Sequence, residues 1–135
     1  MARGFEMNLE RRMALEALGK DLARRAKSRC ELTHAAGVPL RIYEVPPAPP
    51  DPEFDRCLLI SEPALAQIRN PSTLRPEEWH HLADLVWSDL PAAQVMSVRI
   101  LRQLAETEPW AQRLIEETYL DPDIESWAAA ADLGE

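Results

Sequence analysis

The sequence predicts a mainly α fold with a small two-stranded β element near residues 39–61, and three observations point to it. Apolar residues recur at helical spacing before residue 29 and again after residue 61. Between these regions, two short runs of strand-forming residues flank a proline-rich segment. Beyond it, a proline stands near the start of each expected helix, where its missing N–H costs nothing.

The length and charge of the chain limit its architecture and its partners. A chain of 135 residues fits one domain, which we expect to comprise an N-terminal helix (1–28), a ribbon-like β element (29–61) and a helical part (62–135). The net charge of −8 argues against general affinity for nucleic acid, which depends on Lys and Arg neutralising phosphates. Residues 1–29 differ, because they hold eight basic and four acidic side chains. A solvated helix face is the usual meaning of such a stretch, and a basic arm for an anionic partner is the alternative.

The sequence predicts neither a targeting segment nor a disulfide framework. No apolar stretch approaches the roughly 20 residues that a membrane-spanning helix needs. The first residues, MARGFEMNLERRM, carry acids and lack an apolar run, so we expect no secretory signal. Cys30 and Cys57 are too few for a secreted disulfide framework. We therefore expect a cytoplasmic protein with reduced thiols and no membrane contact.

The first expected helix spans residues 5–28. Leu15, Leu18 and Leu22 fall at i, i+3 and i+7, and several alanines raise the helix propensity. Gly19 lowers the propensity near the middle and marks a candidate break. The apolar stripe of this helix predicts either packing on the rest of the domain or pairing with a second copy in a homodimer.

The β element is expected as two short strands joined by prolines. The first contains Leu40, Ile42 and Val45, and the second contains the apolar run 58–60. The segment between them, VPPAPPDP at 45–52, holds five prolines and so forms neither a central strand nor a helix interior. We expect an extended connector, and a ligand for a proline-binding module is the alternative.

Prolines and caps punctuate the helical part. Ser61 is the expected cap of a helix that carries Pro63 in its first turn and ends at Asn70. Pro76 opens the next helix, which we expect to continue through the run EEWHHLADLVWSD at 77–89. Three further helices are expected to start at Pro91, Pro109 and Pro122.

A metal centre is conceivable, although the spacing of the ligands does not demand it. Structural zinc needs four ligands, usually in closely spaced pairs. The conceivable set is Cys30, His34, Cys57 and His81. Buried thiols and ordinary histidines explain the same residues, so we expect no metal, with zinc as the alternative.

A catalytic triad is not expected in the run 77–89. His80, Asp84 and Ser88 share one helix face, but His80 and Ser88 lie about 12 Å apart along the axis. A triad needs direct hydrogen bonds between its members, and no glycine-rich elbow accompanies the serine. We expect a surface pair of His80 with Asp84 instead, and the scarcity of glycine also argues against a phosphate-cradling loop.

Four strings in order resemble the PhnA (alkylphosphonate utilisation, YjdM-like) protein family, specifically its longer bacterial members. They are CEL at 30–32, IYEVPP at 42–47, WSDLPAAQV at 87–95 and YLDPDIESWA at 119–128. The resemblance spans about Leu22 to Ala130. It implies a ribbon-like N-terminal part, often with zinc bound by Cys-x-x-Cys pairs, then a helical segment. It also implies a C-terminal β domain, which this chain does not reach.

This sequence departs from the family pattern at the metal positions. Cys30 matches the first cysteine of the first pair, but Thr33 stands at the second. Ser61 and Ala64 occupy the positions of the following pair. His81 stands where relatives often carry a cysteine, which keeps a possible ligand but does not restore two missing ones. We therefore expect a degenerate zinc ribbon, and we do not carry a phosphonate-cleaving activity across.

The expected function is that of a non-catalytic binding or accessory module that has kept the family scaffold without its zinc. The alternatives are a zinc protein or metal-dependent enzyme linked to phosphonate metabolism, and a regulator that contacts nucleic acid through its N-terminal helix. A protein partner or self-association is expected in the first case. The candidate interaction surface comprises Tyr43, Trp79, Trp87, Arg11, Arg12, Arg24 and Arg25. No catalytic residue is assigned.

Overall fold

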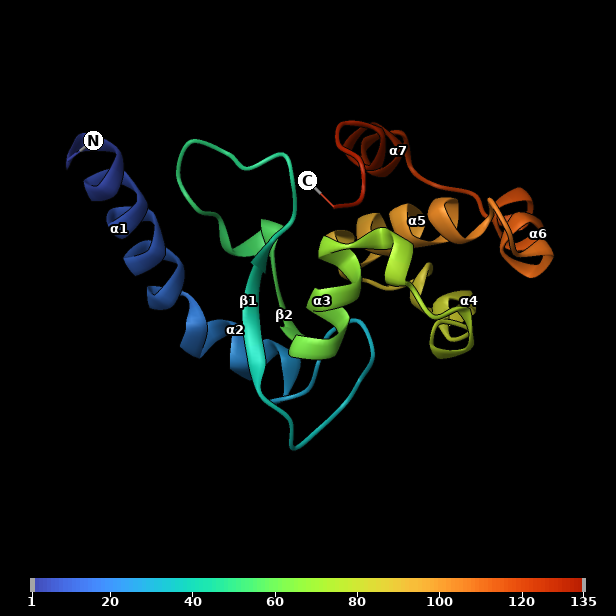
Figure 1. Cartoon of the computed structure of the whole chain (residues 1–135), viewed down its shortest axis with the longest axis horizontal. Coiled ribbons are helices and arrows are strands. Elements are labelled where there is room, and N and C mark those ends of the chain that lie inside the picture. The colour runs from blue at the N-terminus through green and yellow to red at the C-terminus, as the bar shows by residue number, and fades with distance from the viewer. Residues whose placement is uncertain (1, 135) are drawn as a thin grey trace.

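The computed structural model describes the backbone of residues 2–134 and the side chains of residues 8–134. Within that part of the chain there are seven α-helices, three short 3-10 helices (η) and one two-stranded antiparallel sheet (Figure 1). The predicted fold class is therefore confirmed. In chain order, the elements are α1 (Ala2–Ala17), α2 (Gly19–Ala26), β1 (Leu40–Glu44), η1 (Phe54–Arg56), β2 (Cys57–Ser61), α3 (Glu62–Arg69), η2 (Pro71–Thr73), η3 (Pro76–Glu78), α4 (Leu82–Leu85), α5 (Pro91–Leu104), α6 (Pro109–Glu117) and α7 (Pro122–Ala129).

The sheet separates two clusters of apolar side chains. In its register Ile42 lies opposite Leu59 and Tyr43 lies opposite Leu58. Because side chains alternate between the two faces of a strand, Leu58 and Ile60 point to one cluster and Leu59 points to the other. Figure 1 shows α1 and α2 on one side of the strands, with α3 and the remaining helices on the other.

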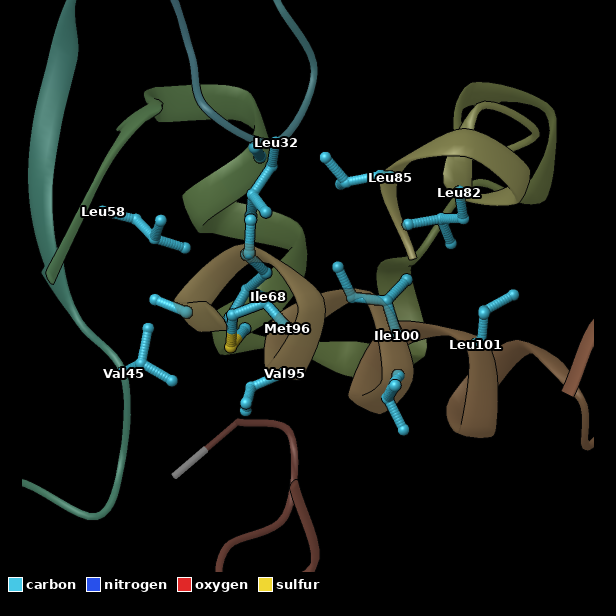
Figure 2. Close-up of a cluster of buried hydrophobic side chains, with 14 of the residues drawn as sticks. Leu32, Val45, Leu58, Ile68, Leu82, Leu85, Val95, Met96, Ile100 and Leu101 are labelled. Carbon is cyan, nitrogen blue, oxygen red and sulfur yellow. The ribbon is translucent and has the colours of Figure 1, made fainter. Parts of the chain in front are cut away.

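The main core lies between the sheet, α3, α4 and α5. Figure 2 shows Leu58 and Val45 from the β element meeting side chains of α3, α4 and α5. α5 is buried along most of its length, and it also contacts α6 and α7. Burying each large aliphatic side chain of such a core contributes about 1.5–3 kcal/mol. The core thus joins residues of the ribbon-like element with those of the helical part.

The smaller cluster holds the N-terminal helices. The predicted helix is broken at Leu18, and the two pieces are α1 and α2. Leu22 is fully buried against Cys57 and Leu59, and Leu15 and Leu18 pack around them. The apolar stripe therefore covers the second face of the sheet. None of the helices within residues 2–134 is both long and apolar enough to cross a membrane.

Proline and cap signals predicted the helix starts well. α3, α5, α6 and α7 each carry a proline at the first or second position. The Ser61 side chain accepts the N–H of Ala64 at 3.4 Å, as expected of an N-cap. The prolines between β1 and β2 form an irregular connector, and the strands on either side of it pair directly.

The long helix expected over residues 76–89 is wrong. Only η3 and the single turn of α4 form there, because Trp79 leaves helical geometry with φ −120° and ψ 12°. Its indole is fully buried and donates to the Gln67 side chain at 2.9 Å, a tertiary contact that competes with a continuous helix. The expected pair of His80 with Asp84 does not form among the described residues. His80 instead packs on Trp110, with ring centroids 4.3 Å apart.

Candidate functional site

Cys30 opens a tight turn at the position of the first corner of the expected ribbon. The backbone N–H of Thr33 donates to the Cys30 sulfur at 3.3 Å, and that of His34 donates to the Cys30 carbonyl at 2.8 Å. His34 has a left-handed backbone with a φ of 64°, and the Cys30 N–H donates to the Ala35 carbonyl at 2.9 Å. The turn thus directs a backbone donor at the sulfur.

Ser61 and Ala64, where the resemblance implies a second cysteine pair, lie next to this turn. The Ser61 backbone acts on the pKa of the Cys30 thiol, and Ala64 shares the main core with Cys30. Burial acts to raise the pKa of Cys30, but hydrogen bonds from the Thr33 side chain and from the backbone of Ser61, Thr33 and Leu32 outweigh it, so that pKa is lowered. Of the four positions at which the resemblance implies paired cysteines, only Cys30 carries a side chain that zinc prefers.

Cys57 does not complete this set, because it lies on the opposite face of the sheet. Its side chain packs with Leu22 and Leu59, whereas Cys30 belongs to the main core. Both thiols are free and buried. Burial is the main cause that raises the pKa of Cys57 to about 11, and Glu44 raises it further. Such a thiol is a poor metal ligand, since the thiolate is the form that binds.

The two candidate histidines lie close together. His81 Nε2 is 2.6 Å from the Leu32 carbonyl oxygen, and its ring stacks on Trp79 with centroids 5.7 Å apart. The exposed His34 ring meets His81 edge-on at 6.4 Å. Across the described residues, no group of three or more His, Cys, Asp or Glu side chains is placed to hold a metal ion. These residues therefore do not fit the zinc that the resemblance implies.

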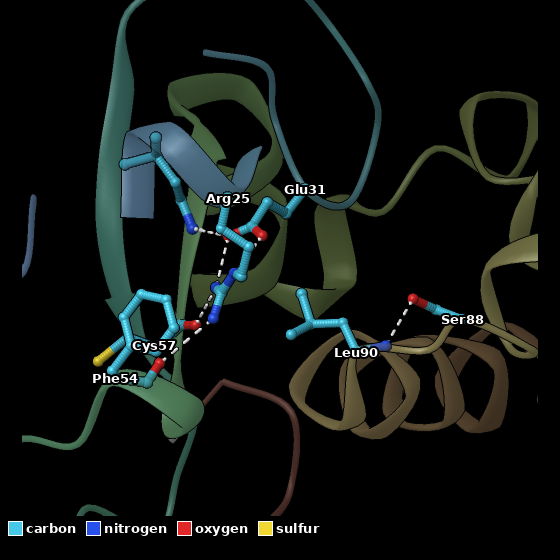
Figure 3. A network of polar contacts seen from close by, with 7 residues as sticks. Arg25, Glu31, Phe54, Cys57, Ser88 and Leu90 are labelled. Atoms are coloured by element: carbon cyan, nitrogen blue, oxygen red, sulfur yellow. Dashed lines mark hydrogen bonds and ion pairs between the residues drawn. The ribbon is translucent and has the colours of Figure 1, made fainter. Parts of the chain in front are cut away.

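Arg25 and Glu31 close the outer edge of β2. The Arg25 guanidinium binds both Glu31 carboxylate oxygens at 2.8 Å and also donates to the Cys57 carbonyl at 2.7 Å (Figure 3). Glu31 accepts the Leu59 N–H at 2.8 Å, and its own N–H donates to the Leu59 carbonyl at 2.8 Å. The Arg25 guanidinium also lies over the Phe54 ring at 4.6 Å. This arginine is a structural residue of the sheet.

Of the other three arginine candidates, one is bound within the chain and two are exposed. Arg11 binds the Glu44 carboxylate and the carbonyls of Pro49 and Pro50, and so fastens α1 to the proline connector. Arg12 and Arg24 are exposed, and Arg24 makes only a long contact of 3.8 Å with Asp21. Half of the proposed basic arm is thus engaged within the chain.

The aromatic candidates are not gathered into one surface. Tyr43 and Trp79 lie in the main core, whereas Trp87 is 54% exposed at the end of α4. Tyr119 is 91% exposed and stands beside an apolar cavity of about 230 Å³, which α5 and α6 line. Neither exposed ring lies beside the sheet.

The outer edge of β1, unlike that of β2, is open. The Val45 N–H donates to the Arg56 carbonyl at 2.9 Å. Because bonded and non-bonded pairs alternate along antiparallel strands, Arg41 and Tyr43 also bond to β2. No backbone of another described residue bonds to the groups that point the other way. Those outward N–H and C=O groups belong to Leu40, Ile42 and Glu44.

A groove of about 660 Å³ runs along this open edge, between α1 and α3. Arg41 pairs with Glu62 at 2.7 Å, and both side chains are largely exposed. Neither Arg12 nor Arg69 forms an ion pair with a described residue. The lining residues are Arg12, Leu15, Glu16, Leu40, Arg41, Ile42, Glu62, Leu65, Ala66 and Arg69.

Comparison with known proteins identifies no relative. A scan against family models, a search of curated proteins and a search of solved structures each found no match to this chain. The resemblance to the PhnA family therefore stays a prediction.

Arg41 and Arg69 are groove residues that the sequence did not single out. Arg41 was visible as a charged residue at an alternate position of an expected strand, which marks it as solvent-facing. The packing of α1 beside β1 and of α3 across from it had no signal in the sequence. Without that packing, neither arginine pointed to a groove.

Proposed function

We propose that this chain is a non-catalytic binding module built on a zinc-ribbon-like element that packs without metal. The observation that carries the proposal is the corner around Cys30, where a fully buried thiol accepts the backbone N–H of Thr33 from its own turn. Ala64 places an apolar methyl group, also buried, at another of the four corners. The corner is thus stabilised by packing and hydrogen bonds where a ribbon would use metal–sulfur bonds.

The binding part of the proposal rests on the groove beside β1. An unpaired strand edge exposes donors and acceptors that another chain can bond, and proteins normally cover or charge such edges. Here the described part of the chain leaves the edge open at the floor of a groove. Membership of the PhnA family and a cytoplasmic location with reduced thiols belong to the same proposal.

Two alternative functions need different residues. A zinc protein would need Cys30, His34, Cys57 and His81 to converge, but Cys57 lies on the other face of the sheet. A nucleic-acid regulator would rely mainly on Arg12 and Arg24, and it predicts binding that weakens steeply with salt.

Metal analysis of the purified full chain tests the proposal. We expect far less than one zinc per chain, and a melting temperature that a chelator leaves unchanged. The variant Cys30→Ala tests the corner, and Cys57→Ala is the matched control, since both remove one buried thiol. One zinc per chain that Cys30→Ala abolishes and Cys57→Ala retains would overturn the proposal.

A further inference from the structure

We propose that the groove beside β1 binds an extended peptide of alternating apolar and acidic residues, which joins the sheet as a third strand. This inference rests on the proposed function, because it names the partner class of the binding module. Figure 1 shows β1 with α1 on one side and α3 on the other, so the edge of the strand forms the floor of the groove.

The backbone of β1 supplies the bonds of strand addition. Leu40, Ile42 and Glu44 direct their N–H and C=O groups outward, at the spacing that an added antiparallel or parallel strand uses. In peptide recognition by strand addition, these main-chain bonds give affinity, and pockets for alternate side chains give specificity. The other edge of the sheet is unsuitable, because Glu31 and Arg25 already bond to β2.

The two walls of the groove differ in chemistry. On the α1 side, the partly buried side chains of Leu15, Leu40 and Ile42 belong to the smaller apolar cluster. The α1 side also carries Arg12 and Glu16 toward solvent. On the other side stand Arg41 of β1 and Arg69 of α3, together with Glu62, Leu65 and Ala66. Because successive side chains of a strand point to opposite faces, a bound strand would send one set toward leucines and isoleucine and the other toward arginines. That alternation selects apolar residues on one face and acidic residues on the other.

The charge of the groove also favours an acidic partner. Its lining contains three arginines and two glutamates, on a chain whose net charge is −8. Arg69 forms no ion pair with a described residue, and the same holds for Arg12, a second arginine of the lining. Arginines that line a groove with apolar walls attract carboxylates and repel basic peptides.

A single peptide strand fits this place better than a second copy of the chain. Neighbouring strands must approach to about 4.8 Å, whereas a helix with its side chains is about 10 Å across. A second copy would carry its own α1 and α3 beside an equally recessed β1. The helices of the two copies would meet before the two edges could bond.

Fluorescence anisotropy with a defined probe tests the inference. The probe is fluorescein-labelled Val-Glu-Val-Glu-Val-Glu-Val, titrated with the full chain. We expect saturable binding that is lost when every Glu of the probe is replaced by Lys. Arg69→Glu should weaken binding about tenfold or more, which corresponds to about 1.4 kcal/mol or more. Arg113→Glu makes the same charge change on the exposed surface of α6, outside the groove, and should leave binding unchanged.

Amide hydrogen exchange distinguishes strand addition from other binding. The probe should slow exchange at Leu40 and Ile42, while Arg41 and Tyr43 are already protected by their bonds to β2. Absence of binding, equal effects of Arg69→Glu and Arg113→Glu, or binding without that protection would each overturn the inference. Protection that grows with protein concentration in the absence of probe would instead assign the edge to a second copy. Because metal content tests the proposed function separately, the two failures are distinguishable.

Discussion

Ile42 and Leu59 face each other across the sheet, yet they differ in whether their outward backbone N–H and C=O groups are hydrogen-bonded. The Leu59 N–H and C=O are both bonded, to the side chain and to the backbone of Glu31. The corresponding groups of Ile42 bond to no described residue. The same two-stranded sheet therefore has one closed edge and one open edge.

The difference between the edges shows how a very small sheet controls which strands can pair with it. A two-stranded hairpin is marginal alone, and here both faces are covered by helices. The closed edge is blocked by the partly buried Arg25–Glu31 ion pair, whose polar atoms bond to the β2 backbone where a third strand would. The open edge is flanked by arginines and by two helices, which limits what can approach it. The open edge is thus shielded but not bonded, which is the arrangement that the proposed binding site requires.

Breaking the closed edge should have the largest effect. Glu31→Ala leaves the Leu59 N–H without its acceptor and the mostly buried Arg25 without its carboxylate. Removing one partner of such a pair typically costs about 3–5 kcal/mol. We expect the free energy of unfolding to fall by about 3 kcal/mol, measured by urea denaturation.

Glu62→Ala is the matched control for that variant, since it removes a carboxylate from a largely exposed pair with Arg41. It should cost less than about 1 kcal/mol. Equal losses in the two variants would mean that the closed edge does not depend on the Arg25–Glu31 network.

Much of this architecture could be predicted from local signals. The two strands, the connector and the starts of four helices follow from proline positions, the Ser61 cap and the alternation of apolar residues. Even the break beside Gly19 had a propensity signal. The main error fell where a tertiary contact overrides local preference, at Trp79, whose indole reaches the side chain of Gln67.

The candidate site was harder to predict. Cys30 was a candidate ligand by residue type, and Ser61 and Ala64 were singled out through the resemblance; the structure places Cys30 and Ala64 in the same core, with Ser61 acting on the Cys30 thiol. No pattern in the sequence placed Cys57 across the sheet from Cys30, because expected burial alone does not say which face of a short strand a residue occupies. Nor did it distinguish Arg25, which is structural, from Arg12, which is exposed.

Alkaline pH should weaken the closed strand through Cys57. Its pKa rises from an ordinary 9.0 to about 11, mainly because the thiol is buried. Since the folded-state pKa is above the unfolded one, this contribution to stability is complete below pH 9 and is lost as the pH rises toward 11. Two pKa units correspond to about 2–3 kcal/mol. Urea denaturation at pH 8 and at pH 11 measures that loss.

Cys57→Ala should show a smaller loss of stability over the same pH interval, because its thiol no longer ionises on unfolding. The tyrosines, the lysines and Cys30 contribute equally to the pH dependence of both chains, so the comparison cancels their contributions. The lowered pKa of Cys30 acts in the opposite direction to that of Cys57. The same pH dependence in both chains would show that Cys57 is hydrated in the folded protein, and so that β2 is not held closed.

Glu62→Gln should have the smallest effect on stability and an opposite effect on binding. The Arg41–Glu62 pair is exposed, so its loss should lower the free energy of unfolding by less than about 1 kcal/mol. In the groove, however, Glu62 competes with an acidic peptide for Arg41. Removing its charge should tighten binding of the alternating Val/Glu probe a few-fold in fluorescence anisotropy, while Glu78→Gln, outside the groove, should not. Weaker binding in Glu62→Gln would show that the carboxylate orients Arg41 for the peptide, so the open edge would depend on a fixed ion pair just as the closed edge does.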